Sequence, residues 1–139
     1  MKNLNLLIVE GNIQEENDNF KKKGIPNHAE SLKESLSYYS SDLNIDVFNP
    51  CSELSFDKVL ANIKKYDGFI AIGCIIKGET ANFDLISSAI TNGIMKISTN
   101  KKKPIGNAIL TCFNEHQAKN RFDKGCEAAK SVITVLNND

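Results

Sequence analysis

The sequence lacks several features that would point directly to a function. Its 139 residues carry no net charge, because 17 Lys and Arg residues balance 17 Asp and Glu residues. Proteins that bind nucleic acid through bulk electrostatics carry an excess of basic residues, so this class is not expected. No apolar run approaches the roughly 20 residues of a membrane-spanning helix, and the first apolar stretch is too short for a signal peptide. We therefore expect neither a nucleic-acid partner nor a membrane partner.

Metal ligands and disulfide frameworks are also missing from the pattern. The four cysteines are scattered without a CxxC pair, and only two histidines could assist them. Neither His28 nor His116 lies in a recognisable catalytic order, and no glycine-flanked nucleophile turn exists. These absences predict no metal site, and they favour buried, reduced thiols in a cytoplasmic protein.

The composition itself is that of a folded globular protein. Hydrophobic residues make up 41% of the chain and charged residues 24%, which excludes a disordered chain. The length suits a single domain over residues 1–139. Zero net charge leaves little repulsion to oppose self-association.

Strand and helix signals alternate along the chain. Short apolar runs ending in turn residues predict four strands, at 4–9, 45–48, 69–76 and 105–111. Apolar residues at helical spacing, or a capping residue followed by a polar stretch, predict about five helices, at 26–39, 56–63, 85–97, 114–122 and 126–136. The strand at 69–76 is continuously apolar, which is typical of a central strand buried on both faces. The two lysine triplets, 21–23 and 101–103, are expected to be solvated loops.

Strands joined by helices predict an α/β fold, a three-layer α/β/α sandwich around a four-stranded parallel sheet. In such folds ligands bind beyond the carboxyl ends of the strands. The exit of the third strand is the most informative, because Gly78 and Thr80 lie between a buried strand and a helix N-terminus. Free amide groups and the helix dipole there favour an anion, and Arg121, the single arginine, could supply a cation. The turn could equally be a plain connection between strand and helix, and Arg121 could equally form a surface ion pair. Residue chemistry alone therefore supports no more than a candidate phosphate site.

The second half carries a family resemblance. Segments from Tyr66 to Ala129 keep the order and near-spacing of motifs from 6,7-dimethyl-8-ribityllumazine synthases: 66–80, Phe83-Asp84, 89–95, 104–111, Gln117-Ala118, Arg121 and 124–129. The resemblance implies a flavodoxin-like fold and condensation of 5-amino-6-ribitylaminouracil with 3,4-dihydroxy-2-butanone 4-phosphate, the penultimate step of riboflavin synthesis. It implies small-molecule substrates, no cofactor and a homo-oligomer of pentamers, sometimes sixty-subunit shells.

The same resemblance assigns roles to individual residues. It implies that Gly78, Glu79 and Thr80 hold the substrate phosphate. Arg121 matches the phosphate-binding arginine that a neighbouring subunit contributes. Lys124 matches a lysine near the same site, and the resemblance places it with position 82 among the catalytic residues.

Departures from the family pattern concern the catalytic and pyrimidine-binding parts. Asn82 replaces the histidine presumed to transfer protons, and asparagine cannot do so near neutral pH. The expected ribityl and pyrimidine side comprises four residues: Ile13, Ser52, Glu53 and Asn107. Of these, Ile13 stands where the family has a stacking aromatic. The 50–53 segment lacks the family's glycine, and its Glu53 comes one residue early.

The first half, about 1–68, instead resembles the opening of a class I glutamine amidotransferase domain, through 7–12, 24–36 and 45–50. Both families begin with the same β-α-β-α-β order, so a crossover near 66–68 would leave the topology unchanged. The different resemblances of the two halves suggest a chimera, or alternatively a divergent synthase whose first half has drifted. Three functional interpretations therefore stand: a lumazine synthase of impaired activity, an inactive scaffold that retains fold and phosphate binding, and an unrelated flavodoxin-like binding domain.

Overall fold

The computed structural model describes residues 4–10, 43–48, 56–121 and 124–138. Its four strands are β1 (Leu4–Glu10), β2 (Leu43–Phe48), β3 (Gly68–Ile76) and β4 (Ile105–Cys112). Its helices are α3 (Phe56–Ala61), α4 (Asn82–Lys101), α5 (Glu115–Lys119) and α6 (Lys124–Asn137). The expected helix at 26–39 lies outside the described residues.

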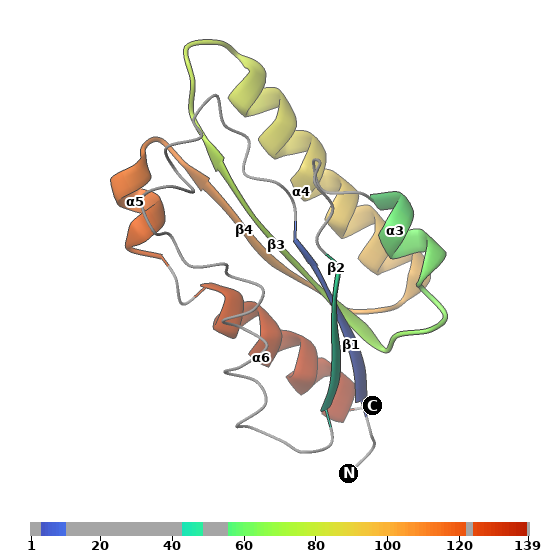
Figure 1. Ribbon diagram of the computed structural model, residues 1–139. Helices are drawn as coiled ribbons and strands as arrows, with labels where there is room; N and C mark the ends of the chain where they lie inside the picture. The colour runs from blue at the N-terminus through green and yellow to red at the C-terminus, as the bar shows by residue number, and fades with distance from the viewer. Residues whose placement is uncertain (1–3, 11–42, 49–55, 122–123, 139) are drawn as a thin grey trace.

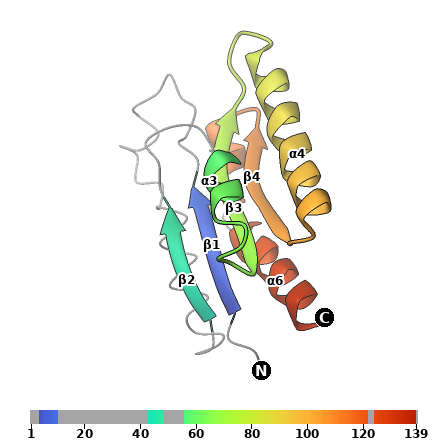
Figure 2. The same cartoon turned by 90° about the vertical axis from the view of Figure 1, so that its right-hand side faces the viewer.

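The four strands form one all-parallel sheet in the order β2-β1-β3-β4, which Figure 2 shows from left to right. The carboxyl ends of the four strands therefore meet at one edge of the sheet, called here the carboxyl edge. Helices α3 and α4 cover one face of the sheet, and α5 and α6 cover the other (Figure 1). The predicted three-layer α/β/α architecture is confirmed.

The continuously apolar strand β3 is the centre of the core. Its first eight residues are buried, because neighbouring strands and helices on both faces cover it. Successive residues point to opposite faces, so Ile70 and Ile72 pack against α6, while Ala71 and Ile75 pack against α4. Burying a large aliphatic side chain stabilises a fold by about 1.5–3 kcal/mol, and β3 supplies several.

Helix α6 lies unusually close to the sheet at Gly106. A Cβ added there would lie 2.7 Å from the carbonyl oxygen of Ala128 and 3.0 Å from its Cβ. Small residues on both elements, Gly106 on β4 and Ala128 and Ala129 on α6, therefore permit the contact. This packing fixes where α6 begins relative to the carboxyl edge.

At the opposite edge of the sheet, hydrogen bonds of Tyr66 connect the segment before β3 to β2 and to the segment before β4. The hydroxyl of Tyr66 donates to Oδ2 of Asp46 on β2 at 2.6 Å, and its carbonyl accepts from Nζ of Lys103 at 2.8 Å. Lys103 was expected in a solvated loop, but it is half-buried because its ammonium bridges to this carbonyl. Lys101 and Lys102 are exposed.

Two helices differ in length from the prediction. Helix α4 extends beyond 85–97 at both ends. Its terminal residues Asn82 and Lys101 are polar and exposed, whereas Phe83 is half-buried and packs against the same buried cluster as Ile86 and Ile90, so the apolar spacing in fact begins before Leu85. Helix α5 ends at Lys119 and not near 122, because the amide of Arg121 bonds the carbonyl of Ala118 in a tighter turn. Arg121 consequently lies in the turn between α5 and α6.

Candidate functional site

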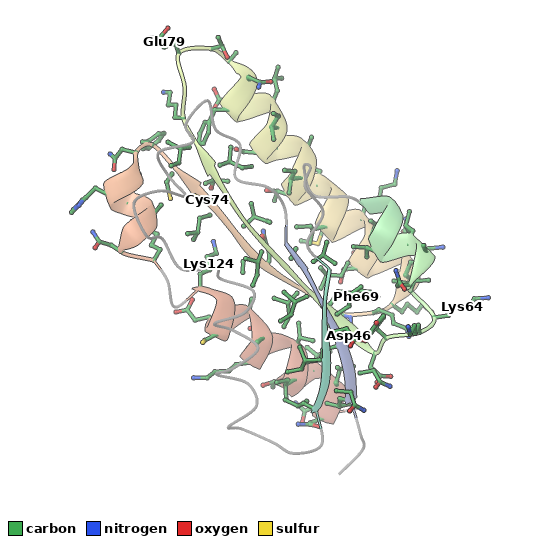
Figure 3. All side chains as sticks on the ribbon, viewed as in Figure 1. Asp46, Lys64, Phe69, Cys74, Glu79 and Lys124 are labelled. Carbon is green, nitrogen blue, oxygen red and sulfur yellow. The ribbon has the colours of Figure 1, made fainter. Side chains whose placement is uncertain are left out.

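The turn after β3 forms the outermost part of the carboxyl edge. The amide of Lys77 donates to the carbonyl of Cys112 at 2.9 Å, which extends the β3–β4 ladder one residue past β3. The chain then leaves the sheet, and Gly78, Glu79 and Thr80 are all exposed. Figure 3 shows Glu79 at the tip of this connection, directed outward. The turn is accessible to a ligand.

The N-terminus of α4 has little side-chain capping. Its N-cap, Ala81, offers no capping side chain. The Thr80 hydroxyl accepts from the amide of Asn82 at 3.3 Å, which leaves its own hydrogen available to donate. Asn82 is exposed at the first helical position. Uncapped amides and the dipole of a 20-residue helix favour an anion here.

The exit of β4 is held by a helix cap. The side chain of Asn114 accepts from the amide of Gln117 at 2.9 Å, which caps α5. The side chain of Gln117 accepts from the amide of Phe113 at 2.8 Å, immediately after β4. The two bonds tie the first turn of α5 to the end of the strand.

Arg121 and Lys124 follow α5 on the same side of the sheet. The guanidinium of Arg121 is exposed, and its Nη1 donates to the carbonyl of Gln117 at 2.8 Å. The amide of Lys124, the first residue of α6, donates to the carbonyl of Arg121 at 3.3 Å. Lys124 is half-buried.

The pKa of the Cys112 thiol depends on its burial and on two nearby cations. Burial raises its pKa, because the thiolate would lose its hydration. The positive charges of Arg121 and Lys124 oppose that rise. Both cations therefore act on the last residue of β4, on the face covered by α5 and α6.

The predicted phosphate-binding residues fall into two groups within one chain. The turn at 78–80 leads into α4, whereas Arg121 and Lys124 lie with α5 and α6 on the opposite face of the sheet. Figure 3 shows Glu79 at the tip of its loop and Lys124 well apart from it, at the start of α6. A single copy thus does not bring Glu79 and Lys124 together.

Of the four residues predicted for the ribityl and pyrimidine side, Ile13, Ser52 and Glu53 lie outside the described residues. Asn107 is half-buried within β4, opposite Ala71, and its side-chain oxygen accepts from the amide of Ile109 at 3.0 Å. It lies five residues before Cys112, or roughly 16 Å along the strand. Asn107 is therefore not grouped with the turn at 78–80.

Sequence reasoning missed a small aromatic and cationic cluster at the carboxyl edge. The Phe113 ring is 63% exposed. The ammonium of Lys77 lies 5.3 Å from its centroid, and the Phe83 ring lies 6.1 Å away at a tilt of 45°. The sequence signal was an aromatic two residues after the strand predicted at 105–111, but the sequence could not indicate that it is exposed.

Two further findings concern metals and membranes. Within the described ranges, no three His, Cys, Asp or Glu side chains gather as a metal site would require. No helix among these residues is both long and apolar enough to cross a bilayer.

The fold and the polar carboxyl edge define an open parallel α/β domain of the class that binds ligands beyond the ends of its strands. Comparison with known proteins narrows this class. A family model for 6,7-dimethyl-8-ribityllumazine synthase matches residues 53–139, which is more than half of the chain. The chain belongs to the 6,7-dimethyl-8-ribityllumazine synthase family.

Individual relatives carry the same name. The 6,7-dimethyl-8-ribityllumazine synthase of Methylibium petroleiphilum is 43% identical over 81 residues, covering 58% of this chain and 51% of the relative. That of Polynucleobacter necessarius is 36% identical over 105 residues, covering 74% and 61%. That of Leuconostoc mesenteroides is 34% identical over 114 residues, covering 76% and 73%. The chain thus spans 51–61% of the length of the first two relatives.

The extent of these matches bears on the first half of the chain. A match over 76% of the chain exceeds what the residues from 66 onward could supply, so it includes part of the first half. This extent favours a divergent synthase over a chimera. The resemblance to an amidotransferase remains a prediction from the sequence.

Proposed function

We propose that this chain condenses 5-amino-6-ribitylaminouracil with 3,4-dihydroxy-2-butanone 4-phosphate, in riboflavin biosynthesis, at a reduced rate. Membership of the synthase family supports the reaction class. The observation that carries the proposal is the exposed turn at 78–80 before an uncapped 20-residue helix, within the region that the family model matches. Amides and the helix dipole at such a turn suit a phosphate ester.

The phosphate is held from two sides in this proposal. The turn formed by Gly78, Glu79 and Thr80 contributes main-chain amides and the Thr80 hydroxyl. Arg121 of a second copy contributes a planar guanidinium, and Lys124 adds positive charge beside it. The separation of the two groups on opposite faces supports a site shared between copies, and hence a homo-oligomer, a pentamer or multiple of pentamers in this family.

The ribitylaminouracil is assigned to the remaining predicted residues. Ile13, Ser52, Glu53 and Asn107 line its ribityl and pyrimidine side in this proposal. The reaction needs no metal or organic cofactor, and the proposed location is the cytoplasm.

Asn82 accounts for the reduced rate. It lies exposed at the first position of α4, next to the phosphate turn, where a proton-transfer group is missing. General acid–base catalysis contributes about 10²- to 10⁴-fold. Binding and orientation of two substrates still accelerate a condensation without it. The same substitution favours a second candidate, a scaffold that binds phosphate without turnover.

A condensation assay separates the two candidates. The purified protein is mixed with both substrates, and lumazine formation is followed optically against a control without protein. We expect formation above the uncatalysed rate, lost in Arg121→Ala and retained in Lys96→Ala, which removes an exposed cation of α4. Formation at the uncatalysed rate alone would leave the scaffold interpretation.

A further inference from the structure

Gln117 connects the end of the sheet to the guanidinium of Arg121. Its side-chain oxygen accepts from the amide of Phe113 at 2.8 Å. Its carbonyl accepts from Nη1 of Arg121 at 2.8 Å, and its amide is held by the side chain of Asn114 at 2.9 Å. The half-buried Gln117 is thus hydrogen-bonded to the end of β4, to the N-cap residue of α5 and to the guanidinium of Arg121.

Helix α5 cannot hold this geometry by its own stability. It has five residues, and isolated helices shorter than about 12–15 residues are marginal in water. Its attachment to the sheet therefore depends on contacts with the rest of the protein. Ala118, which is 2% exposed, packs with Leu110 and Cys112, and the bond from Gln117 to Phe113 fixes the helix to the end of β4. Loss of that bond would loosen the whole turn that carries Arg121.

The remaining contacts of Arg121 are consistent with a guanidinium that is held but accessible. Its amide bonds the carbonyl of Ala118 at 3.1 Å, and its carbonyl accepts from the amide of Lys124. Its side chain is exposed. A guanidinium has five N–H donors, so one bond to Gln117 fixes its orientation without using up its capacity for an anion.

We infer that Gln117 is a positioning residue, which sets the guanidinium of Arg121 for binding the substrate phosphate. This inference rests on the proposed function in taking Arg121 as the phosphate ligand. Gln117 itself touches no substrate atom. Its side chain anchors α5 to the sheet, and its carbonyl orients the guanidinium.

A double-mutant cycle with inorganic phosphate as the probe tests the inference. Phosphate affinity is measured by calorimetry for the full chain, Gln117→Leu, Arg121→Ala and the double variant. We expect Gln117→Leu to weaken phosphate binding about threefold to tenfold, as for the loss of one hydrogen bond. In the Arg121→Ala background the same change should alter affinity less than twofold, because the group it positions is absent.

Two further variants serve as controls for the cycle. His116→Ala removes an exposed side chain of the same helix, whose contact is with Asn120, and it should leave phosphate affinity unchanged. Gln117→Asn keeps the amide but is one methylene too short to reach Phe113, so it should weaken binding in the same direction even if Gln117→Leu does not fold. An effect of Gln117→Leu that persists undiminished without Arg121 would overturn the inference.

The inference and the proposed function fail differently. If the unaltered chain shows no condensation but the phosphate cycle behaves as described, the reaction is wrong and the positioning role stands. If the chain condenses its substrates while Gln117→Leu changes neither phosphate affinity nor the KM for the butanone phosphate, the positioning role is wrong. Phosphate affinity that is unaffected by Arg121→Ala contradicts both the role of Gln117 and the assigned phosphate site.

Discussion

Asn82 is the residue to which the proposed function assigns the reduced rate, because the family resemblance implies a histidine at its position. It occupies the first position of a long helix, exposed beside the phosphate turn. An asparagine there can donate and accept hydrogen bonds, but it cannot change protonation state near neutral pH. The surrounding main chain is that of a regular helix start, so a different side chain can be introduced without rebuilding the turn.

Restoring a titratable side chain should therefore raise turnover. We expect Asn82→His to increase kcat at least tenfold, toward the 10²- to 10⁴-fold that acid–base catalysis supplies. The change is measured by the optical lumazine assay, with Asn92→His, on an exposed position of the same helix, as the matched control. Equal rates for both variants and the unaltered chain would mean that the departures at Ile13, Ser52 and Glu53 limit the reaction instead.

Tyr66 provides a test of the hydrogen bond that connects the segment before β3 to Asp46 on β2. The hydrogen bond to Asp46, together with burial and the charge of Asp46, raises the pKa of Tyr66 from 10.0 to about 12. Because the pKa in the folded state is raised, this bond stabilises the fold fully below pH 10, and the contribution is lost as the pH rises from 10 to 12.

The corresponding variant is Tyr66→Phe. We expect it to lower the free energy of unfolding by about 1–2 kcal/mol at pH 8, since Asp46 is exposed and solvent screens the pair. Urea unfolding at pH 8 and near pH 12 should show that the gap between the two proteins closes at the higher pH. A gap of constant size across this range contradicts the assigned hydrogen bond.

At the scale of elements, two glycines should respond to substitution in opposite ways. Gly106→Ala should destabilise the protein by about 1–3 kcal/mol, because the new Cβ would meet the main chain of α6 at 2.7 Å. At Gly78 an added Cβ meets nothing within 4 Å. Gly78→Ala should therefore leave the thermal unfolding midpoint nearly unchanged while weakening phosphate binding, if a ligand approaches the main chain there.

Calorimetry and phosphate titration of the two variants separate packing from binding. The account requires that Gly106→Ala lowers the unfolding temperature without altering the phosphate affinity of the folded protein. A destabilised Gly78→Ala would show that this glycine serves the fold, and a variant with full phosphate affinity would show that no ligand approaches the main chain at Gly78.

The elements were predictable where apolar residues repeat. Strand β3 was evident because buried strands of parallel sheets are continuously apolar, and the structure extends the prediction only to Gly68. The C-terminal end of α4 was not, because Lys101 is polar and exposed. At the N-terminal end Phe83 continues the apolar spacing to Ile86, a signal that the prediction from Leu85 overlooked. The length of α5 depends on a local hydrogen bond from Arg121 to Ala118, which competes with helix continuation and leaves no compositional signal.

At the scale of the whole molecule, residue chemistry indicated which residues could bind phosphate, and only the family resemblance implied that Arg121 acts from a neighbouring copy. The order of strands and the alternation of side chains decide which face each residue reaches. These factors place Arg121 with α5 and α6, away from the turn that leads into α4. The fold of one copy shows this separation, and the separation is the physical reason to expect a site completed by another copy.

Sharing of the site between copies is the central claim, and complementation tests it most directly. Thr80→Val and Arg121→Ala are each expected to lower turnover, because each removes a different part of the phosphate site. Chains carrying the two changes are tagged differently and co-expressed, and mixed assemblies are purified by both tags. In a random mixture about a quarter of the shared sites combine an unaltered turn with an unaltered arginine.

The lumazine assay on these mixed assemblies gives the result. The account predicts turnover above that of either parent, approaching about a quarter of the unaltered protein. If the mixed assemblies show only the average of their parents while the unaltered chain remains active, both groups act within one copy, and the proposed arrangement of the site is wrong.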